Sequence, residues 1–293
     1  ARQEFSQLDV QLHVVDYEDG NHLAFNLQGV DLVISTVSGR AQINLIHAAV
    51  RGRVRVFVPS EFEGSISHRP DHHHHDPLDR GSSQALALLR NLARHAQIRY
   101  TVFSCGLFME RFHPSGLAYL NIGRGAAIAN PGDYLVDINR ATAEFADRDA
   151  RGRSVRVCLS SVYDVVRFLV AAIDLGAERW PVEFTMCGDR MSLNQLVDTC
   201  SRVRNGSRRL TAPSPVHFTR HTRSIAELQA YISHFNHAGD AARTAYYQRL
   251  LATANGRYDF SHANLNDAIL RSNLGEVQPL TLNQWLVIML QST

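Results

Sequence analysis

The chain has 293 residues, of which 45% are hydrophobic and 20% are charged, and its formal net charge is +2. A chain of this length can bury a large core in one big domain or in two unequal lobes, and its composition is typical of a soluble globular protein. The small net charge argues against nucleic acid or an acidic membrane surface as a partner, and no apolar run approaches the roughly 18 residues that a membrane helix requires.

The cysteines favour a reducing compartment. The four cysteines, Cys105, Cys158, Cys187 and Cys200, form no Cys-x-x-Cys pair. We therefore expect reduced, half-buried thiols. The first residues of the chain contain no apolar core of a signal peptide. Both observations predict a cytoplasmic protein.

Strand and helix patterns alternate in the first part of the chain. Residues 10–15 alternate between apolar and polar side chains, which predicts a strand, and Asp19 is placed to cap a short helix. Residues 30–36 and 55–58 are short apolar runs with β-branched residues, and a helical pattern over residues 41–50 separates them. Strands that alternate with helices predict an α/β fold with a doubly wound parallel sheet.

The strand of residues 55–58 leads into a candidate site. Pro59 ends this strand because proline has no N–H for a sheet ladder, and Ser60 and Glu61 follow. Ligands of open α/β sheets bind at the carboxyl ends of strands, so a hydroxyl beside a carboxylate at this edge is a candidate for chemistry. The alternative interpretation is that both side chains cap the backbone of the loop.

A polar loop over residues 64–82 contains four adjacent histidines, His72 to His75. Histidine is the commonest metal ligand, but consecutive residues rarely converge on one ion. We therefore predict no metal site, and a solvated loop beside a pocket. Ser82 or Ser83 is predicted to cap the next helix, and residues 98–104 are predicted to form the next strand.

The second half of the chain has a less regular order of elements. Residues 224–255 form a long polar helical region, and Trp285 lies in an amphipathic final helix. We predict a Rossmann-like domain over residues 1–125 and a smaller substrate-binding lobe over residues 126–293. The lobe is expected to be interleaved with the sheet around residues 155–190.

Two short motifs resemble a known family. Residues 33–38 read Val-Ile-Ser-Thr-Val-Ser, Gln42 follows, and residues 57–62 read Phe-Val-Pro-Ser-Glu-Phe. At this spacing the pattern resembles the NmrA-like branch of the atypical short-chain dehydrogenases. That branch includes isoflavone reductases, pinoresinol–lariciresinol reductases and many fungal proteins of secondary metabolism. The resemblance runs from about Leu12 to the C-terminus, and it implies a Rossmann-like doubly wound parallel sheet with a smaller C-terminal substrate lobe.

The resemblance also implies which residues form the site. Residues 100–108 follow the family's Tyr-Thr-x-x-x-x-Gly-x-Phe pattern, whose last residues line the substrate pocket. The implied substrate contacts are Phe62, His68, Cys105, Gly106, Leu107, Phe108 and Arg111. The implied cofactor contacts are Thr36, Val37, Ser38, Gln42 and Pro59. The candidate catalytic residues are Ser60, Glu61, Ser82 and His72.

Two features depart from the family pattern. In the family, a phosphate-binding glycine loop lies about forty residues before the position that matches Asp16, and this chain begins after that point. The family's reductases also use a lysine, which aligns with Ser82 or with Leu86, whereas all 30 basic residues of this chain are arginine. Serine without a tuned partner cannot do acid–base work at neutral pH, and arginine stays protonated. We therefore expect the chain as it stands to bind NADPH weakly or not at all.

Three functions remain open from the sequence. The lineage implies an NAD(P)H-dependent reductase of a small aromatic or polyketide-like molecule, because hydride transfer requires chiefly that cofactor and substrate are positioned. The missing lysine favours a cofactor-independent cyclase, isomerase or dehydratase that uses Glu61, a histidine of the loop or Cys105. The third alternative is a non-catalytic binding or regulatory protein, as some NmrA-like proteins are. The expected partner is a small hydrophobic molecule, and the oligomeric state stays open, with a homodimer as one alternative.

The topology predicts where the candidate groups meet. The carboxyl ends of consecutive parallel strands are expected to lie side by side. Glu61, the loop of residues 68–75, Cys105 and Phe108 are expected to surround a mostly apolar cavity, with Glu61 as its chief ionisable group. The competing interpretation makes Glu61 a structural residue that is tied to backbone amides.

Overall fold

The computed structural model of the protein describes residues 8, 10–69, 76, 78–79, 81–122, 130, 132–208, 216–272 and 277–291. The chain folds into two compact units. The first consists of Ala1–Glu61, Asp79–Val102 and Trp180–Val182, and the second of Phe62–Leu78, Phe103–Arg179 and Glu183–Thr293. The domain boundary near residue 125 stays a prediction.

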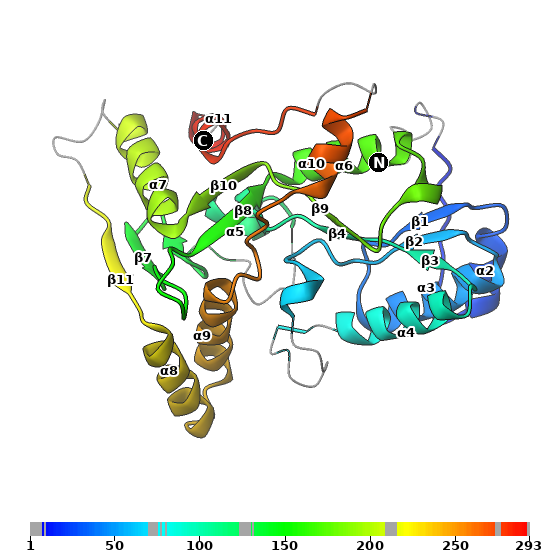
Figure 1. Cartoon of the computed structure of the whole chain (residues 1–293), viewed down its shortest axis with the longest axis horizontal. Helices are drawn as coiled ribbons and strands as arrows, with labels where there is room; N and C mark the ends of the chain where they lie inside the picture. Colours follow the sequence, from blue (N-terminus) through cyan, green and yellow to red (C-terminus); the bar gives the residue numbers. More distant parts are fainter. Residues whose placement is uncertain are drawn as a thin grey trace. The chain divides into compact units, whose positions relative to one another are not determined.

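The first unit is built on a parallel sheet of three short strands, β1 (Leu32–Ile34), β2 (Val56–Val58) and β3 (Arg99–Tyr100). The middle strand is β2, and both of its neighbours run parallel to it. The helices α3 (Gly39–Arg51) and α4 (Ser82–Arg94) connect the strands and pack against each other (Figure 1). These features confirm the predicted α/β fold with a parallel sheet.

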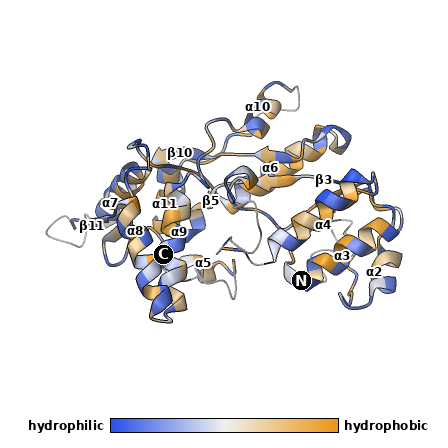
Figure 2. Cartoon of the chain, turned by 60° about the horizontal axis from the view of Figure 1, so that its bottom comes forward, coloured by the Kyte–Doolittle hydropathy of each residue, from blue (hydrophilic) through white to orange (hydrophobic). Residues whose placement is uncertain are grey.

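Local sequence accounts for the helices of this unit. The helix α2 (Gly20–Asn26) begins at the predicted residue, because Asp19 Oδ1 accepts the N–H groups of Asn21 and His22, each at 3.0 Å. Figure 2 shows both apolar and polar residues along α3 and α4, as expected of helices with one buried and one solvated face.

One predicted strand of the first unit is wrong. Residues 10–15 are not in a strand, and their apolar members Val10, Leu12 and Val14 are exposed. No strand of the described residues pairs with this segment. An alternating pattern forms a strand only where a neighbouring strand takes up its N–H and C=O groups.

The second unit contains two three-stranded mixed sheets among its described residues. Their strand orders are β10 (Asp189–Ser192), β8 (Arg156–Ser160), β5 (Leu107–Phe108), and β11 (Thr219–Thr222), β7 (Thr142–Phe145), β6 (Val136–Asp137). A further pair joins β4 (Val102–Ser104) to β9 (Glu183–Thr185). The helices and single helical turns are η1 (Ile66–His68), η3 (Met109–Phe112), α5 (Gly116–Tyr119), α6 (Val162–Asp174), η4 (Ala177–Arg179), α7 (Leu193–Arg208), α8 (Ile225–His237), α9 (Ala241–Ala254), α10 (Asn264–Leu270) and α11 (Leu282–Gln291).

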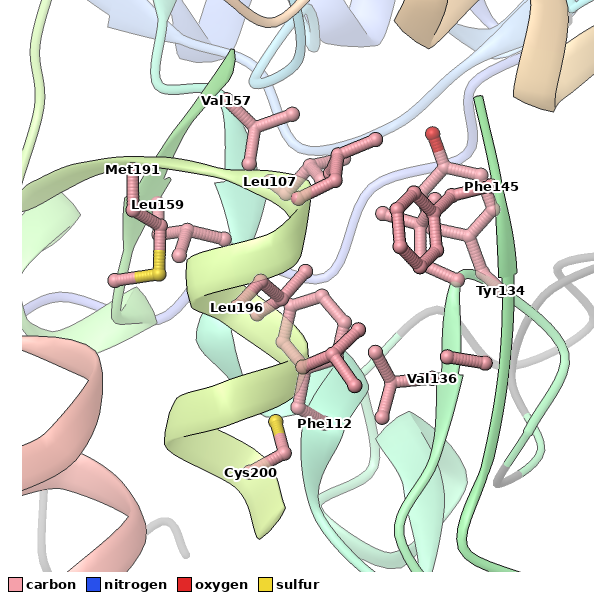
Figure 3. Packing of buried hydrophobic residues seen from close by; sticks show 14 of the residues in the cluster. Leu107, Phe112, Tyr134, Val136, Phe145, Val157, Leu159, Met191, Leu196 and Cys200 are labelled. Atoms are coloured by element: carbon pink, nitrogen blue, oxygen red, sulfur yellow. The ribbon is translucent and has the colours of Figure 1, made fainter. Parts of the chain in front are cut away.

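The main hydrophobic core lies in the second unit. Figure 3 shows Phe112, Phe145 and Leu196 packed among the residues of this core. The predicted final helix is α11, and its Trp285 is buried in the same core. Full burial of each such side chain contributes about 1.5–3 kcal/mol to stability.

The predicted helical region of residues 224–255 is two helices rather than one. The first, α8, begins with a capping box, in which Ser224 Oγ accepts the Glu227 N–H and the Glu227 carboxylate accepts the Ser224 N–H. Gly239, with φ of +71°, ends it, and Asp240 caps α9. A single glycine therefore divides a sequence that is helical on both sides.

Candidate functional site

The carboxyl ends of β1 and β2 lie side by side in the first unit. Ile34 is the register partner of Val58, and the Ser35 N–H donates to the Val58 carbonyl at 2.8 Å. The segments of residues 36–39 and 59–61 therefore leave the sheet at the same edge. This confirms the predicted arrangement of the two strand ends.

Gln42 links the two segments that leave this edge. Its Oε1 accepts the backbone N–H of Ser60 at 2.6 Å, and only 1% of the residue is exposed. Its Nε2 is buried and has no hydrogen-bond partner within the described part of the chain. A buried amide normally uses both of its ends, so this edge carries one spare donor.

The start of α3 adds further donors to the edge. The N-cap Ser38 has extended backbone and makes no side-chain capping bond. Gly39, the first helical residue, has φ of +64°, and a Cβ at this position would meet nothing within 4 Å. The first N–H groups of a helix carry partial positive charge, and a 13-residue helix such as α3 favours acceptor-rich or anionic groups at its start.

The start of α4 lies beside the start of α3 but differs from it. A Cβ on Gly81, whose φ is +86°, would lie 3.2 Å from Gly39 Cα. The predicted cap at Ser82 or Ser83 is wrong, because Gly81 is the N-cap residue and Asp79 Oδ1 accepts the Ser83 N–H at 3.0 Å. The Asp79 carboxylate therefore already accepts an N–H group of the first turn of α4. The first residue of α4 is Ser82.

The predicted residues of the first unit are placed as follows. Thr36 and Ser38 are exposed, and Val37, Ser60 and Ser82 are half-buried. Pro59 and Gln42 are buried, and Glu61 is 3% exposed at the end of the segment that follows β2. All of them belong to the loops and helix starts at the carboxyl edge of the sheet.

The remaining predicted residues lie in the second unit. The Cys105 and Gly106 N–H groups both donate to the Glu63 carbonyl, at 2.9 and 3.1 Å, so this turn is tied to the segment after Phe62. Gly106 has φ of +73°, and a Cβ there would overlap the carbonyl oxygen of Cys158. Only glycine fits this position.

The exposure of these second-unit residues differs widely. Cys105 and Leu107 are buried, whereas Phe62, Phe108 and Arg111 are half-buried and His68 is exposed. Burial, reinforced by the nearby Glu63 carboxylate, raises the pKa of the Cys105 thiol, so this group stays protonated. His72 lies outside the described residues, and the cavity expected around these groups stays a prediction.

Sequence reasoning missed a buried ion cluster beside this turn. Arg257, 3% exposed, donates to both Glu63 carboxylate oxygens at 2.8 and 2.9 Å and to Asp76 at 2.9 Å. Tyr258 Oη donates to Glu63 at 3.0 Å, and Arg69 lies 3.3 Å from it. The charges balance within the cluster, which favours a structural role. No local pattern signals a pair that is 194 residues apart in the chain.

Glu110 is a second buried carboxyl that the sequence did not indicate. It lies in η3, is 2% exposed, and accepts the Val162 N–H at 2.9 Å at the start of α6. Burial, together with repulsion from Asp164, raises its pKa from 4.5 to about 7.

No cluster of histidine, cysteine, aspartate and glutamate side chains suited to a metal ion occurs among the described residues, and the histidine run is outside them. Among the described helices, none is both long and apolar enough to cross a membrane.

Comparison with known proteins identifies the family of this chain. A sequence model described as the NmrA-like family matches residues 1–240. The chain belongs to the NmrA-like family. Among curated relatives, oxidoreductase swnN of Metarhizium robertsii is 22% identical over 282 residues, covering 87% of this chain and 76% of that protein.

Solved structures of similar fold include reductases. AtPrR2 with NADP+ and (+)-pinoresinol matches with a TM-score of 0.63 at 17% identity, over 98% of this chain and 84% of that one. The leucoanthocyanidin reductase–NADPH complex of Vitis vinifera matches with a TM-score of 0.61 at 13% identity, over 99% and 85%. The quinone oxidoreductase QOR2 of Escherichia coli, complexed with NADPH, matches with a TM-score of 0.60 at 16% identity, over 98% and 86%. At these identities the similarity establishes the Rossmann-like fold of this NmrA-like protein.

Proposed function

We propose that this NmrA-like protein is an oxidoreductase that uses NAD(P)H to reduce a small, mostly apolar molecule. The aromatic or polyketide-like compounds of secondary metabolism are the substrate class that the lineage favours. Family membership and the oxidoreductase relative support this proposal. The observation that carries it is the geometry of the first-unit edge. There Gln42 accepts the Ser60 N–H, and its Nε2 has no acceptor among the described residues.

The residues at this edge fit a dinucleotide. The Gln42 Nε2 group and the N–H groups at the start of α3 are hydrogen-bond donors that no side chain of the described residues is seen to use. A dinucleotide is rich in acceptor oxygens that such donors can bind. Thr36, Val37 and Ser38 would contact it from one loop and Pro59 from the other. When bound, the cofactor supplies a hydride, and the protein supplies position and proton.

The proton source is limited by composition. Because the chain has no lysine, the candidates for that role are carboxyl and imidazole groups. Ser60 and Ser82 are half-buried at the edge, and Glu61 is buried at the end of the same loop. We assign proton delivery to Glu61, with Ser60 and Ser82 orienting the substrate oxygen.

The second unit is proposed to supply the substrate contacts. Phe62 and Phe108 offer half-buried apolar surface, and Arg111 offers a cation. Cys105, Gly106 and Leu107 are buried and shape the turn that carries Phe108. His68 is the remaining candidate for a substrate contact, and His72 is the remaining candidate for a catalytic residue.

A second candidate function follows from the same absence of lysine. A cofactor-independent cyclase, isomerase or dehydratase needs only an acid or base and a pocket that holds the substrate folded. Glu61 would then act directly on the substrate.

One experiment separates the two functions. The purified chain is incubated with aromatic ketones, enones and quinones, with NADPH, with NADH and without cofactor. Nicotinamide absorbance and product masses are followed. The proposal expects cofactor oxidation matched by a product two hydrogens heavier. Product of unchanged mass, or lighter by one water, that forms without cofactor contradicts it and supports the second candidate.

Replacing Glu61 by Gln tests its role in either reaction, because the change keeps the shape and removes the charge. A proton-transfer role predicts that turnover falls by about 10²-fold or more. The exposed Asp174→Asn variant is the control. Turnover of Glu61→Gln within about threefold of the wild type, well short of that loss, would make Glu61 structural.

A further inference from the structure

The second unit contains a cavity of about 580 Å³ that is walled by charged side chains. Its lining comes from His68 at the end of η1, from the β7–β8 connection, from the first residue of β8, from β10, and from the end of α9 with the turn that follows it. This volume lies within the range of small-molecule sites. Four arginines, Arg151, Arg153, Arg156 and Arg190, line it against the two carboxylates of Asp149 and Asp259.

Both carboxylates are already neutralised by two of these arginines. Arg153 Nε donates to Asp149 at 2.8 Å, and the Arg151 N–H donates to the same carboxylate at 2.9 Å. Arg190 donates to Asp259 through Nε at 2.7 Å and through Nη2 at 3.1 Å, a two-pronged pair. The other two arginines, Arg151 and Arg156, have no carboxylate partner among the described residues.

Arg156 is the more sheltered of the two remaining cations. It is half-buried, and its Nη2 makes one long bond of 3.4 Å to the Arg190 carbonyl. Its Nε is buried without an acceptor, and no carboxylate within the described residues pairs with it. A guanidinium has five donors, and sheltering its charge from water without a counter-charge is costly.

The strand register places two arginines on one face of the β8–β10 ladder. Arg156 is paired with Ser192, and Arg190 with Cys158. Because side chains two residues apart on a strand share a face, Arg156 and Arg190 are diagonal neighbours on that face. Arg151 is exposed at the same cavity and likewise has no carboxylate partner in the described part of the chain.

We propose that this cavity binds a small molecule through a phosphate group, with Arg156 as the principal contact and Arg151 as the second. A dianion supplies the counter-charge that the two arginines lack, and planar guanidinium groups match phosphate oxygens. The site is made of second-unit residues only. It shares His68 with the proposed substrate contacts, but its phosphate contacts, Arg156 and Arg151, take no part in the proposed reductase reaction.

The test is a calorimetric titration of the full chain with inorganic phosphate at constant ionic strength, with malonate in a parallel titration. We expect one saturable phosphate site. Arg156→Gln is expected to raise its dissociation constant by about tenfold or more, the loss typical of a charged hydrogen bond. Arg202→Gln, an exposed arginine of α7, is the matched control and is expected to bind as the wild type.

The proposal is overturned if the wild type shows no saturable phosphate binding, if only malonate binds, or if Arg156→Gln and Arg202→Gln bind equally. Should Arg156→Gln fail to fold, the exposed Arg151→Gln variant decides instead. Phosphate binding that is weaker by about threefold or more supports the proposal, and binding equal to the wild type overturns it.

Discussion

The buried Gln42, near the start of α3, connects the two strand-end loops through a hydrogen bond from the Ser60 N–H. Because Gln42 is buried, its oxygen depends on this bond in place of water. The Ser60 N–H has Gln42 Oε1 as its acceptor at 2.6 Å, in a place that is shielded from water. A buried N–H without an acceptor costs about 1–3 kcal/mol. The bond therefore holds the two strand-end loops together.

Gln42→Met keeps the volume and removes the acceptor. We expect a loss of about 1–3 kcal/mol in the free energy of unfolding, because the N–H of the half-buried Ser60 loses its acceptor. Urea unfolding measures it, with Gln84→Met, an exposed position of α4, as the matched control. Equal stability of both variants would mean that the Gln42–Ser60 bond contributes nothing.

Glu110 makes stability depend on pH. Its pKa in the folded protein, about 7, lies above the ordinary 4.5, because burial disfavours the carboxylate. Between pH 4.5 and pH 7, the folded state therefore keeps a proton that the unfolded state has released. The contribution of protonated Glu110 to the free energy of unfolding is complete below about pH 4.5. It is lost as the pH rises through about 7, by about 3 kcal/mol at most.

Glu110→Gln removes this titration while keeping an acceptor for the Val162 N–H. Relative to the wild type, the variant is expected to gain stability near pH 8 and to gain much less near pH 5, where most of the contribution is still present. Urea unfolding at both pH values measures the difference, and Asp174→Asn serves as the exposed control. An unchanged pH dependence in Glu110→Gln would contradict the assignment.

At the scale of elements, short sequence signals predict helix caps and strand ends, which depend on neighbouring residues. Asp19 caps α2 as predicted, and Pro59 follows β2, because caps and strand ends depend on a few adjacent residues. The strand of residues 10–15 fails for the opposite reason, since a strand needs a partner from elsewhere in the chain. The cap of α4 was misplaced because Asp79, four residues before Ser83, supplies the acceptor.

The Glu63–Arg257 pair belongs to the same scale, because it ties the segment after Phe62 to the turn after α9. Arg257→Met leaves the buried Asp76 carboxylate without its arginine and leaves Glu63 with Arg69 alone. We expect a loss of about 3–5 kcal/mol in the free energy of unfolding, the cost of breaking a buried pair. Arg202→Met, on the exposed side of α7, is expected to change it by at most about 0.5 kcal/mol. A loss for Arg257→Met no larger than that of the control would contradict a structural role.

At the scale of the whole molecule, the fold class was predictable and the division into units was not. The alternation of strands and helices is visible in the sequence. No local pattern shows that the first unit is made of three separate segments, Ala1–Glu61, Asp79–Val102 and Trp180–Val182. The first-unit edge was predicted because its residues directly follow strands. The arginine cavity was not, because Arg156 and Arg190 meet only through the β8–β10 register.

The central claim is that the edge formed by Gln42, Ser60 and the start of α3 is the dinucleotide site. The most direct measurement is an amide chemical-shift titration of the full chain with NADPH, repeated in Arg156→Gln so that binding in the arginine cavity is recognised. We predict that the Gly39, Arg40 and Ser60 amides shift in both proteins. Shifts that are absent at these amides, or confined to residues around Arg156, would contradict the claim.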